Sequence, residues 1–378
     1  MSISPIMACF AAFALSSTAL CAQTTWVKNN HALELTGVIQ TMYNHRFYEH
    51  TATDQKKNRF LLDDARLQLN GKIKSKWAYQ VELNMADLVR VVVDKNQYTP
   101  IINANVAYTK LSNIEIKVGY QRIPFSVSSM TPFFYSAFLQ RPEMARGDFF
   151  SRRDVGVVID YSVLNECLSA TAGVFTGMGE QSLLGDNDAS GAPEYTARIA
   201  YSYPSKYRYR DIDLYGTPTP QVRIGANARY ANKRSNTGAD YGMKTINGEK
   251  YLYGADFSFQ YQHFAAQFEI LQARLQHRVP TTTEIAYNTN YQLAGGIAAQ
   301  ISYAVPQVRS SLALRYDDFN PNDLVLGDMA RTVSVGYVYF IDDYKTAFRV
   351  HYFKRLADGT NAKAFTDDQI RAALQFTF

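Results

Sequence analysis

The residues with the clearest chemical meaning are four arginines that lie in or directly after one apolar stretch, segment 124–151. They are Arg141, Arg146, Arg152 and Arg153. At the narrow point of a channel, a guanidinium group replaces the lost hydration of an anion with charge-assisted hydrogen bonds. This arrangement predicts an anion-binding constriction. The alternative, left open for each arginine, is a purely structural ion pair, as the run Arg152-Arg153-Asp154 would allow.

Segment 124–151 is itself unusual, because it is long, aromatic and poor in charge. Its aromatic residues include Phe133, Phe134, Tyr135, Phe138, Phe149 and Phe150. A connection surrounded by water would be polar, so these rings must pack against something. We expect the segment to fold inward and pack on the wall of the protein. Packing on a neighbouring subunit or on lipopolysaccharide is the alternative.

Catalytic and cofactor-binding patterns are missing from the sequence. The six histidines are scattered, and none stands beside a serine as a barrel phospholipase would require. There is no phosphate-binding loop and no dinucleotide fingerprint. The sequence therefore predicts no enzyme, no cofactor and no metal site, and a barrel hydrolase ranks behind every other reading.

Composition favours strands over helices and excludes helical membrane spans. The 378 residues include 27 Tyr and 22 Phe but only 2 Trp, and the mean hydropathy is −0.25. Aromatic residues favour strands, and membrane barrels collect them in two girdles. The net charge of +5 is not gathered in a block. A basic and aromatic stripe at 201–210 is similar to nucleic-acid surfaces, but it more simply indicates such a girdle, so no nucleic-acid partner is expected.

The first 22 residues differ from the rest of the chain. Residues 6–22 carry no charge and are rich in Ala, Phe, Leu and Ser. This pattern is typical of a secretory signal, cleaved after Ala22 or after Ala19, although its start lacks Lys and Arg. We therefore expect a signal peptide at 1–22 and a single domain at 23–378, in which Cys167 is the only thiol.

Sixteen segments of the expected mature chain alternate between apolar and polar residues, as strands with one apolar face do. They are 33–43, 59–69, 77–85, 101–111, 115–123, 152–161, 168–176, 195–203, 221–231, 251–261, 264–275, 291–303, 308–317, 331–341, 344–355 and 369–378. Their lengths suit strands that cross a bilayer at a tilt.

The connections alternate in length as well. Gaps that follow the first, third and every other odd segment are long, whereas gaps after even segments are short, with 204–220 as the one exception. Long loops on one side and tight turns on the other are typical of outer-membrane barrels. An even number of strands places both ends of the barrel on the periplasmic side. We therefore predict an all-β fold, a sixteen-stranded antiparallel transmembrane β-barrel with an inward-folded third loop, the segment 124–151.

A barrel of this size encloses an aqueous lumen, and its polar face should line that lumen. The basic residues expected there are Arg66, Lys117, Arg198, Arg223, Arg229, Arg309, Arg315, Arg349 and Arg371. The acidic ones are Glu34, Asp64, Glu82, Glu115, Asp154, Asp160, Asp256 and Glu269. The two sets nearly balance, so these counts alone support only a weak preference for anions.

The last ten residues, 369–378, alternate cleanly and end on Phe378. A free strand edge invites aggregation, so a chain that ends on such a strand suggests closure against the first strand. We expect 369–378 to be the sixteenth strand and to lie beside 33–43.

Several short patterns resemble the phosphate-selective porin O and P family. Residues 66–72, Arg-Leu-Gln-Leu-Asn-Gly-Lys, are similar to its early Arg-x-x-Leu-x-Gly strand. Residues 118–126, Val-Gly-Tyr-Gln-Arg-Ile-Pro-Phe-Ser, resemble the segment that enters its third loop. Arg141-Pro142 and residues 153–157 match the exit from that loop, and residues 172–177 match the hairpin that follows. The resemblance is good over 59–177 and thin beyond.

The resemblance implies a sixteen-stranded, trimeric channel in the outer membrane of a Gram-negative bacterium. It also implies that Phe378 is the signal read by the barrel assembly machinery. The family's best-known members select anions with arginines and lysines at the constriction, whereas segment 124–151 has arginines and no lysine.

Together these observations predict a passive diffusion channel for small hydrophilic solutes with weak selectivity for anions of the phosphate type. The expected partners are small anions, outer-membrane lipid, lipopolysaccharide and two further copies of the chain. The runner-up is a structural or surface-binding barrel that does not conduct.

Overall fold

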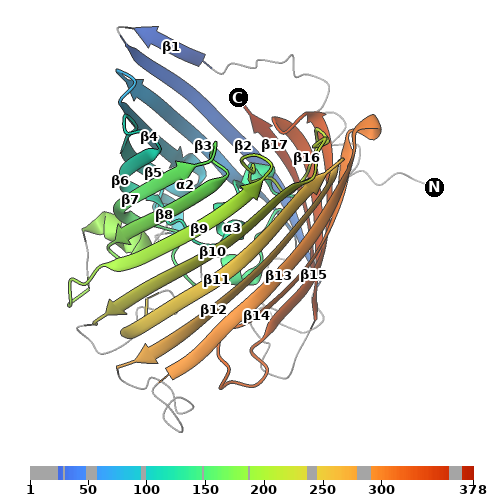
Figure 1. Ribbon diagram of the computed structural model, residues 1–378. Coiled ribbons are helices and arrows are strands. Elements are labelled where there is room, and N and C mark those ends of the chain that lie inside the picture. Colours follow the sequence, from blue (N-terminus) through green and yellow to red (C-terminus); the bar gives the residue numbers. More distant parts are fainter. Residues whose placement is uncertain are drawn as a thin grey trace.

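The structure is a computed structural model in which one curved sheet closes on itself (Figure 1). It describes residues 24–28, 30–47, 58–94, 99–146, 149–185, 188–235, 245–278, 291–356 and 368–378. The expected signal segment 1–22 lies outside the described residues, so its assignment stays a prediction.

All sixteen expected strands are present and antiparallel to their neighbours, and one short strand, β1, precedes them. The bounds are β1 Thr24–Lys28, β2 His31–Phe47, β3 Asn58–Ile73, β4 Trp77–Asn84, β5 Ile101–Tyr108, β6 Ile114–Arg122, β7 Arg153–Val163, β8 Leu168–Phe175, β9 Glu194–Tyr203, β10 Gln221–Lys233, β11 Gly248–Tyr261, β12 Phe264–His277, β13 Tyr291–Val305, β14 Ser310–Asn320, β15 Ala330–Asp342, β16 Thr346–Leu356 and β17 Asp368–Thr377.

The barrel closes where β17 pairs with β2, as expected from the alternation at the end of the chain. Phe376 lies opposite Ile39, and beyond the strand Phe378 exchanges backbone hydrogen bonds of 2.8 and 2.9 Å with Gly37. The strand β1, which the sequence did not predict, pairs with the start of β2 beyond this point. Every interior strand therefore has two neighbours, and the barrel leaves no long open edge.

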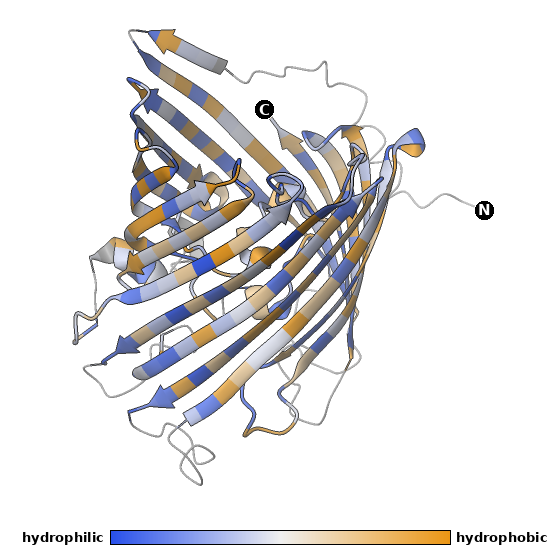
Figure 2. Cartoon of the chain, in the orientation of Figure 1, coloured by the Kyte–Doolittle hydropathy of each residue, from blue (hydrophilic) through white to orange (hydrophobic). Residues whose placement is uncertain are grey.

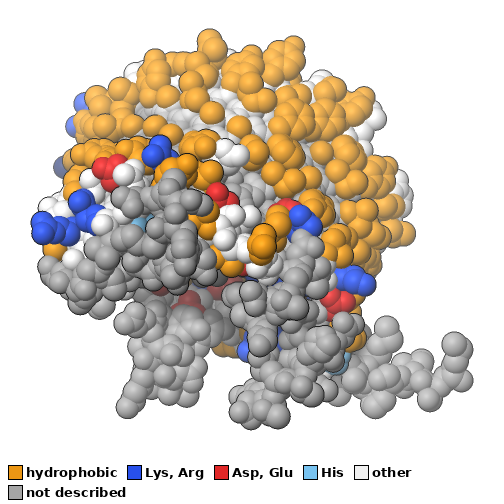
Figure 3. Space-filling model, turned by 90° about the horizontal axis from the view of Figure 1, so that it is seen from below, with side chains coloured by type: hydrophobic (Ala, Val, Ile, Leu, Met, Phe, Trp, Pro, Cys, Tyr) orange, Lys and Arg blue, Asp and Glu red, His pale blue; other side chains and the backbone are white. Residues whose placement is uncertain are grey.

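The outer surface of the barrel is apolar, because alternate side chains of each strand point outward. Figure 2 shows hydrophobic and hydrophilic residues alternating along β10 to β13, and Figure 3 shows hydrophobic side chains gathered over the outer wall. Large outward side chains such as Ile199, Ile224, Phe268 and Leu312 are between 41% and 57% exposed. Such a surface fits a hydrocarbon environment, since the strands of the closed sheet are hydrogen-bonded to their neighbours.

Short helices occupy some of the connections. They are α2 Met85–Asp94, α3 Val127–Met130 and the 3₁₀ turns η1 Phe133–Tyr135, η2 Glu143–Ala145, η3 Gly179–Leu184 and η4 Pro306–Val308. No helix within the described ranges is long and apolar enough to cross a membrane.

The inner face of the barrel is divided into two regions of different character. On β3 to β7 it is polar, with the side chains of Arg66, Gln68, Gln80, Glu82, Asn103, Asn105, Lys117, Gln121 and Asp160. On β11 to β15 it is mostly small or apolar, and the residues include Leu252, Leu271, Leu275, Ala294, Ala298, Ala313, Val338 and Phe340. We call these regions the polar wall and the apolar wall.

The apolar wall is covered by two connections that pack against it from opposite ends. In the third loop (residues 124–151), Phe125, Met144, Phe149 and Phe150 form one buried cluster with side chains of β11 to β15. In the connection between β9 and β10, which we call the 204–220 turn, Ile212 and Leu214 form a second cluster. It includes Ala137 and Phe138 of the third loop and inner-face residues of β13 to β16.

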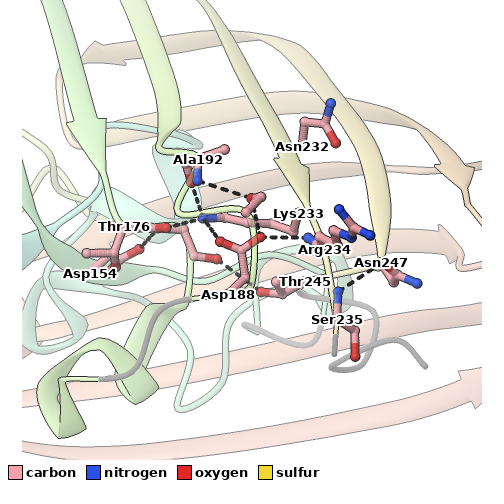
Figure 4. A network of polar contacts seen from close by, with 12 residues as sticks. Asp154, Thr176, Asp188, Ala192, Asn232, Lys233, Arg234, Ser235, Thr245 and Asn247 are labelled. Carbon is pink, nitrogen blue, oxygen red and sulfur yellow. Dashed lines mark hydrogen bonds and ion pairs between the residues drawn. The ribbon is translucent and has the colours of Figure 1, made fainter. Parts of the chain in front are cut away.

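A buried lysine connects long loops to one another (Figure 4). These loops lie at the rim of the barrel opposite the short turns. The ammonium group of Lys233, at the end of β10, donates hydrogen bonds to the carbonyl oxygens of Thr176 and Ala192 and lies 3.4 Å from Oδ1 of Asp188. The other carboxylate oxygen of Asp188 accepts a 2.6 Å hydrogen bond from the backbone N–H of Arg234. The connection between β8 and β9 is therefore fixed to the end of β10.

Candidate channel and its arginine cluster

Two cavities lie along the polar wall and meet at shared residues. The cavity toward the long loops has a volume of about 750 Å³, and the one toward the short turns about 730 Å³. Lys117, Gln121 and Arg122 of β6 line both cavities. The two cavities therefore adjoin at these three side chains, and we call the two cavities together the passage.

Arg122 reaches the lumen because the strand loses its alternation just before it. A regular strand would place Arg122 on the same face as Val118, which is 52% exposed on the outer surface. Gly119 has φ of 131°, and a Cβ atom there would lie 2.3 Å from the carbonyl oxygen of Ala104. After this glycine, Tyr120, Gln121 and Arg122 all line the cavity toward the long loops. A strict period-two pattern would therefore place Arg122 on the wrong face.

The arginines of this cavity differ in how their charge is balanced. Arg66 lies 2.7 Å from Asp64 and 3.3 Å from Glu82, so its charge is largely compensated. Arg122 donates to the carbonyl oxygen of Met130, and Arg141 donates to those of Ser128 and Thr131 at 3.0 and 2.7 Å. Within the described part of the chain, neither of these two guanidinium groups forms an ion pair with a carboxylate.

Arg122 at the end of β6 and Arg141 of the third loop thus concentrate positive charge in the cavity toward the long loops. Burial, and then the charges of Arg152, Arg122 and Arg153, lower the pKa of Arg141 well below its usual range. Arginine nevertheless stays protonated in proteins. A carbonyl oxygen offers only a partial negative charge, so the hydrogen-bond acceptors of Arg141 do not cancel its positive charge.

Three of the four predicted constriction residues come together in this cavity. Arg141, Arg152 and Arg153 line it together with Arg66 and Lys117 of the predicted lumen wall. Arg146 does not line either cavity, and its guanidinium lies 2.9 Å from the carboxylate of Glu143.

The predicted wall residues on the short-turn side also line the passage, but in compensated pairs. Lys117 lies 3.0 Å from Glu115, and Arg198 lies 2.6 Å from Asp256. Arg223 shares Asp256 at 3.9 Å and stacks on the ring of Tyr209, which lies 4.1 Å from its guanidinium carbon.

Three further predicted wall residues lie beneath the covering connections. Arg315 donates to the carbonyl oxygen of Gln140 at 2.8 Å, and Arg349 donates to those of Phe133 and Phe134, so both hold the third loop. Arg229 pairs with Glu194 beneath the rings of Phe125 and Phe150. These residues position the loop, and none of them lines either cavity. Of the remaining two, Arg309 lies in the turn before β14, and Arg371 stacks on Phe353 at 5.3 Å.

A carboxylate on the apolar wall fixes the start of the third loop. Glu269 of β12 is fully buried, and it accepts hydrogen bonds of 2.7 and 3.2 Å from the backbone N–H groups of Val127 and Ser128. These are the first N–H groups of α3, which have no partner within the helix. The loop is therefore held from three strands, β12 and β14 of the apolar wall and β16 beside it.

Among the residues of the passage that sequence reasoning missed are Gln121, Arg122 and Tyr209. The quoted resemblance contains Arg122 within residues 118–126, so a family motif offered a signal that the alternation did not. No group of three or more His, Cys, Asp or Glu side chains in the described ranges is arranged to hold a metal ion.

Comparison with known proteins places this geometry in context. The family model of phosphate-selective porin O and P matches residues 34–378. The outer-membrane channel DcaP of Acinetobacter baumannii has a similar structure, with a TM-score of 0.62 and 14% identity over 93% of this chain and 99% of that chain. Salmonella typhi OmpF in complex with daunomycin has a TM-score of 0.59 and 14% identity, over 94% of this chain and 100% of that chain. In-vitro folded OmpT of Vibrio cholerae in its trimer form has a TM-score of 0.58 and 11% identity, over 93% of this chain and 100% of that chain. At these identities the likeness shows the fold alone, and a search of curated proteins found no match.

Proposed function

Because this chain belongs to the phosphate-selective porin O and P family, and is thus an outer-membrane porin and not an enzyme, we propose that its pore favours small anions. The passage runs along the polar wall from the long-loop side, past Lys117, Gln121 and Arg122, to the short-turn side. Small hydrophilic solutes diffuse through it without coupling to any reaction. The preference is weak, as expected from the nearly balanced wall charges.

The observation that carries this proposal is that Arg122 and Arg141, which line the cavity toward the long loops, form no ion pair with a carboxylate of the described residues. A unit charge about 8 Å from an ion, at an effective dielectric constant of about 20, contributes roughly 2 kcal/mol. Compensated arginines such as Arg66 contribute far less, because the carboxylate cancels most of the field. Two unpaired guanidinium groups therefore outweigh the nearly neutral remainder of the wall.

The zero-current potential of single channels in a potassium chloride gradient tests this proposal. We expect the sign of an anion-preferring channel, and we expect the preference to fall in Arg122→Gln but to persist in Arg122→Lys. Arg331→Gln is the matched control, because Arg331 pairs with Asp318 at 2.8 Å and lines neither cavity. A cation-preferring wild-type channel, or an unchanged potential in Arg122→Gln, contradicts the proposal. Folded protein without any conductance would favour a structural barrel instead.

The biological setting that we propose follows from the family. Residues 1–22 direct export and are removed, Phe378 is read by the barrel assembly machinery, and the apolar belt contacts membrane lipid and lipopolysaccharide. We also propose a homotrimer, which is supported by the trimer form of the similar OmpT structure. The mass of the purified assembly in detergent tests that state, and a monomer would contradict it.

A further inference from the structure

The 204–220 turn is the one connection on the short-turn rim that is long, and it folds back into the barrel. Its residues 210–214 read Arg-Asp-Ile-Asp-Leu, and Ile212 and Leu214 are 1% and 9% exposed. A turn that served only to join β9 to β10 needs two residues, as the turn between β11 and β12 shows. The extra length must therefore have another use.

The turn meets the third loop inside the barrel through Asp211. The backbone N–H of Asp211 donates to the carbonyl oxygen of Tyr135 at 3.1 Å. Oδ2 of Asp211 accepts from the hydroxyl of Ser136 at 2.8 Å and from the N–H of Ala137 at 3.1 Å. These three hydrogen bonds join a connection from one rim of the barrel to a connection from the other.

Arg210 strengthens the same junction. Its guanidinium carbon lies 5.0 Å from the ring centre of Tyr135 in the third loop, 5.3 Å from that of Tyr344 and 5.4 Å from that of Tyr215. A cation surrounded by three aromatic rings is held by their negative faces. The three tyrosines come from the loop, from the turn between β15 and β16, and from the 204–220 turn itself.

The turn is also fastened to the wall that it covers. The hydroxyl of Ser302 on β13 donates to the carbonyl oxygen of Asp211 at 2.6 Å, and the hydroxyl of Tyr344 donates to that of Ile212 at 2.6 Å. In the middle of the turn, Asp213 accepts a hydrogen bond of 3.0 Å from the N–H of His263 in the turn between β11 and β12. The segment therefore crosses beneath the apolar wall from β10 toward β16.

From these contacts we infer that the 204–220 turn is a second pore-shaping element, which locks the third loop in place and closes the lumen along the apolar wall. Solutes are thereby confined to the polar wall, where the arginines act on them. The same turn contributes Lys206 and Tyr209 to the cavity on the short-turn side. The inference rests on the proposed channel function and assigns its pore size and selectivity to a connection outside the third loop.

Single-channel recording of a shortened variant tests this inference. Residues 204–220 are replaced by the two-residue turn Gln-His found between β11 and β12. We expect a higher unit conductance and a loss of anion preference, because a second path opens beside the apolar wall. The control shortens the turn at 306–309, which lies on the same rim and, among the described residues, makes no hydrogen bond to the third loop. Wild-type conductance and preference in the shortened variant would overturn the inference.

A pair of point variants keeps the test informative if the shortened chain fails to fold. Asp211→Ala and Asp211→Asn both remove one negative charge, but the amide oxygen of asparagine can still accept from Ser136 and Ala137. We expect larger current fluctuations and a raised conductance in Asp211→Ala, and wild-type traces in Asp211→Asn. Equal behaviour of the two variants would contradict the lock. If the wild-type protein conducts nothing, the proposed function fails. If the wild-type protein conducts and the shortened variant and Asp211→Ala show the same conductance and ion preference as the wild type, the proposed channel stands and only this inference fails.

Discussion

At the scale of single residues, the partners of a charged side chain decide its role. Arg122 faces the passage, Arg66 is balanced by two carboxylates, and Arg349 is buried beneath the third loop with carbonyl oxygens as its acceptors. Lys233 is the extreme case, because it is 1% exposed and works as a fixed cation among oxygen atoms of the long loops. Residue type alone indicated a lumen charge for Arg66 and Arg349 alike, and only the partners distinguish them.

The contacts of Lys233 with Asp188 and the nearby carbonyl oxygens, which we call the lysine latch, lead to a prediction about pH. Burial alone would raise the pKa of Asp188, but hydrogen bonds from Ser190 and the N–H of Arg234, together with the charge of Lys233, lower it below 3.8. A carboxylate with a lowered pKa stabilises the folded state above its ordinary pKa, and this contribution disappears as the pH falls through the lowered value. We expect limited proteolysis between β8 and β9 to remain slow at neutral pH and down to about pH 4. Lys233→Met should make that connection cleavable at neutral pH, and equal resistance of the two proteins would contradict the latch.

At the scale of elements, the alternation of apolar and polar residues predicted the strands well. It predicted poorly which side chains face the lumen and which parts of the inner face are covered. All sixteen segments form strands. Successive side chains of a barrel strand point alternately to lipid and to the lumen, so polarity alternates along the sequence. The pattern failed at Gly119, where one backbone angle changes which face Arg122 occupies. It also could not show that β11 to β15 are covered from inside, although apolar residues on both faces of β12, such as Leu271 and Phe268, are the signal for such a cover. Contacts between connections far apart in sequence, such as Asp211 with Ser136, leave no periodic trace.

The kink at Gly119 predicts a specific loss of stability. In Gly119→Ala the new Cβ atom would lie 2.3 Å from the carbonyl oxygen of Ala104, in a backbone conformation that side chains rarely adopt. We expect the free energy of unfolding to fall by on the order of 1–3 kcal/mol. A lower urea midpoint of unfolding would measure this loss. Gly191→Ala is the control, because Gly191 also has a positive φ, of 62°, but no atom within 4 Å of the added Cβ. Equal shifts in the two variants would argue against the close approach to Ala104.

At the scale of the whole molecule, the barrel depends on its closing seam and on the division of its lumen. The ring of Phe378 covers Gly37, where a Cβ atom would meet it at 2.3 Å, and it stacks on Phe376 with ring centres 6.1 Å apart. The terminal aromatic residue thus completes the contact between β17 and β2. Inside the barrel, we propose that the two covering connections leave the polar wall as the route for solutes.

Deletion of Phe378 should impair insertion far more than conductance. The deletion removes the ring over Gly37 and the proposed assembly signal, but it changes no residue that lines the two cavities. The amount of folded barrel in outer-membrane fractions measures insertion, and single-channel recording of the barrels that do form measures conductance. Phe378→Tyr keeps an aromatic ring and should insert normally. Normal assembly without Phe378 would contradict its role.

The most direct test of the account asks which wall the solutes follow. In a Cys167→Ser background, a cysteine is introduced either at Gln121, where both cavities meet, or at Ala298, on the covered apolar wall. A charged thiol reagent is then added during single-channel recording. We predict that the reagent reduces the current through Gln121→Cys and leaves Ala298→Cys unchanged. Block of Ala298→Cys together with no effect on Gln121→Cys would show that the passage runs elsewhere.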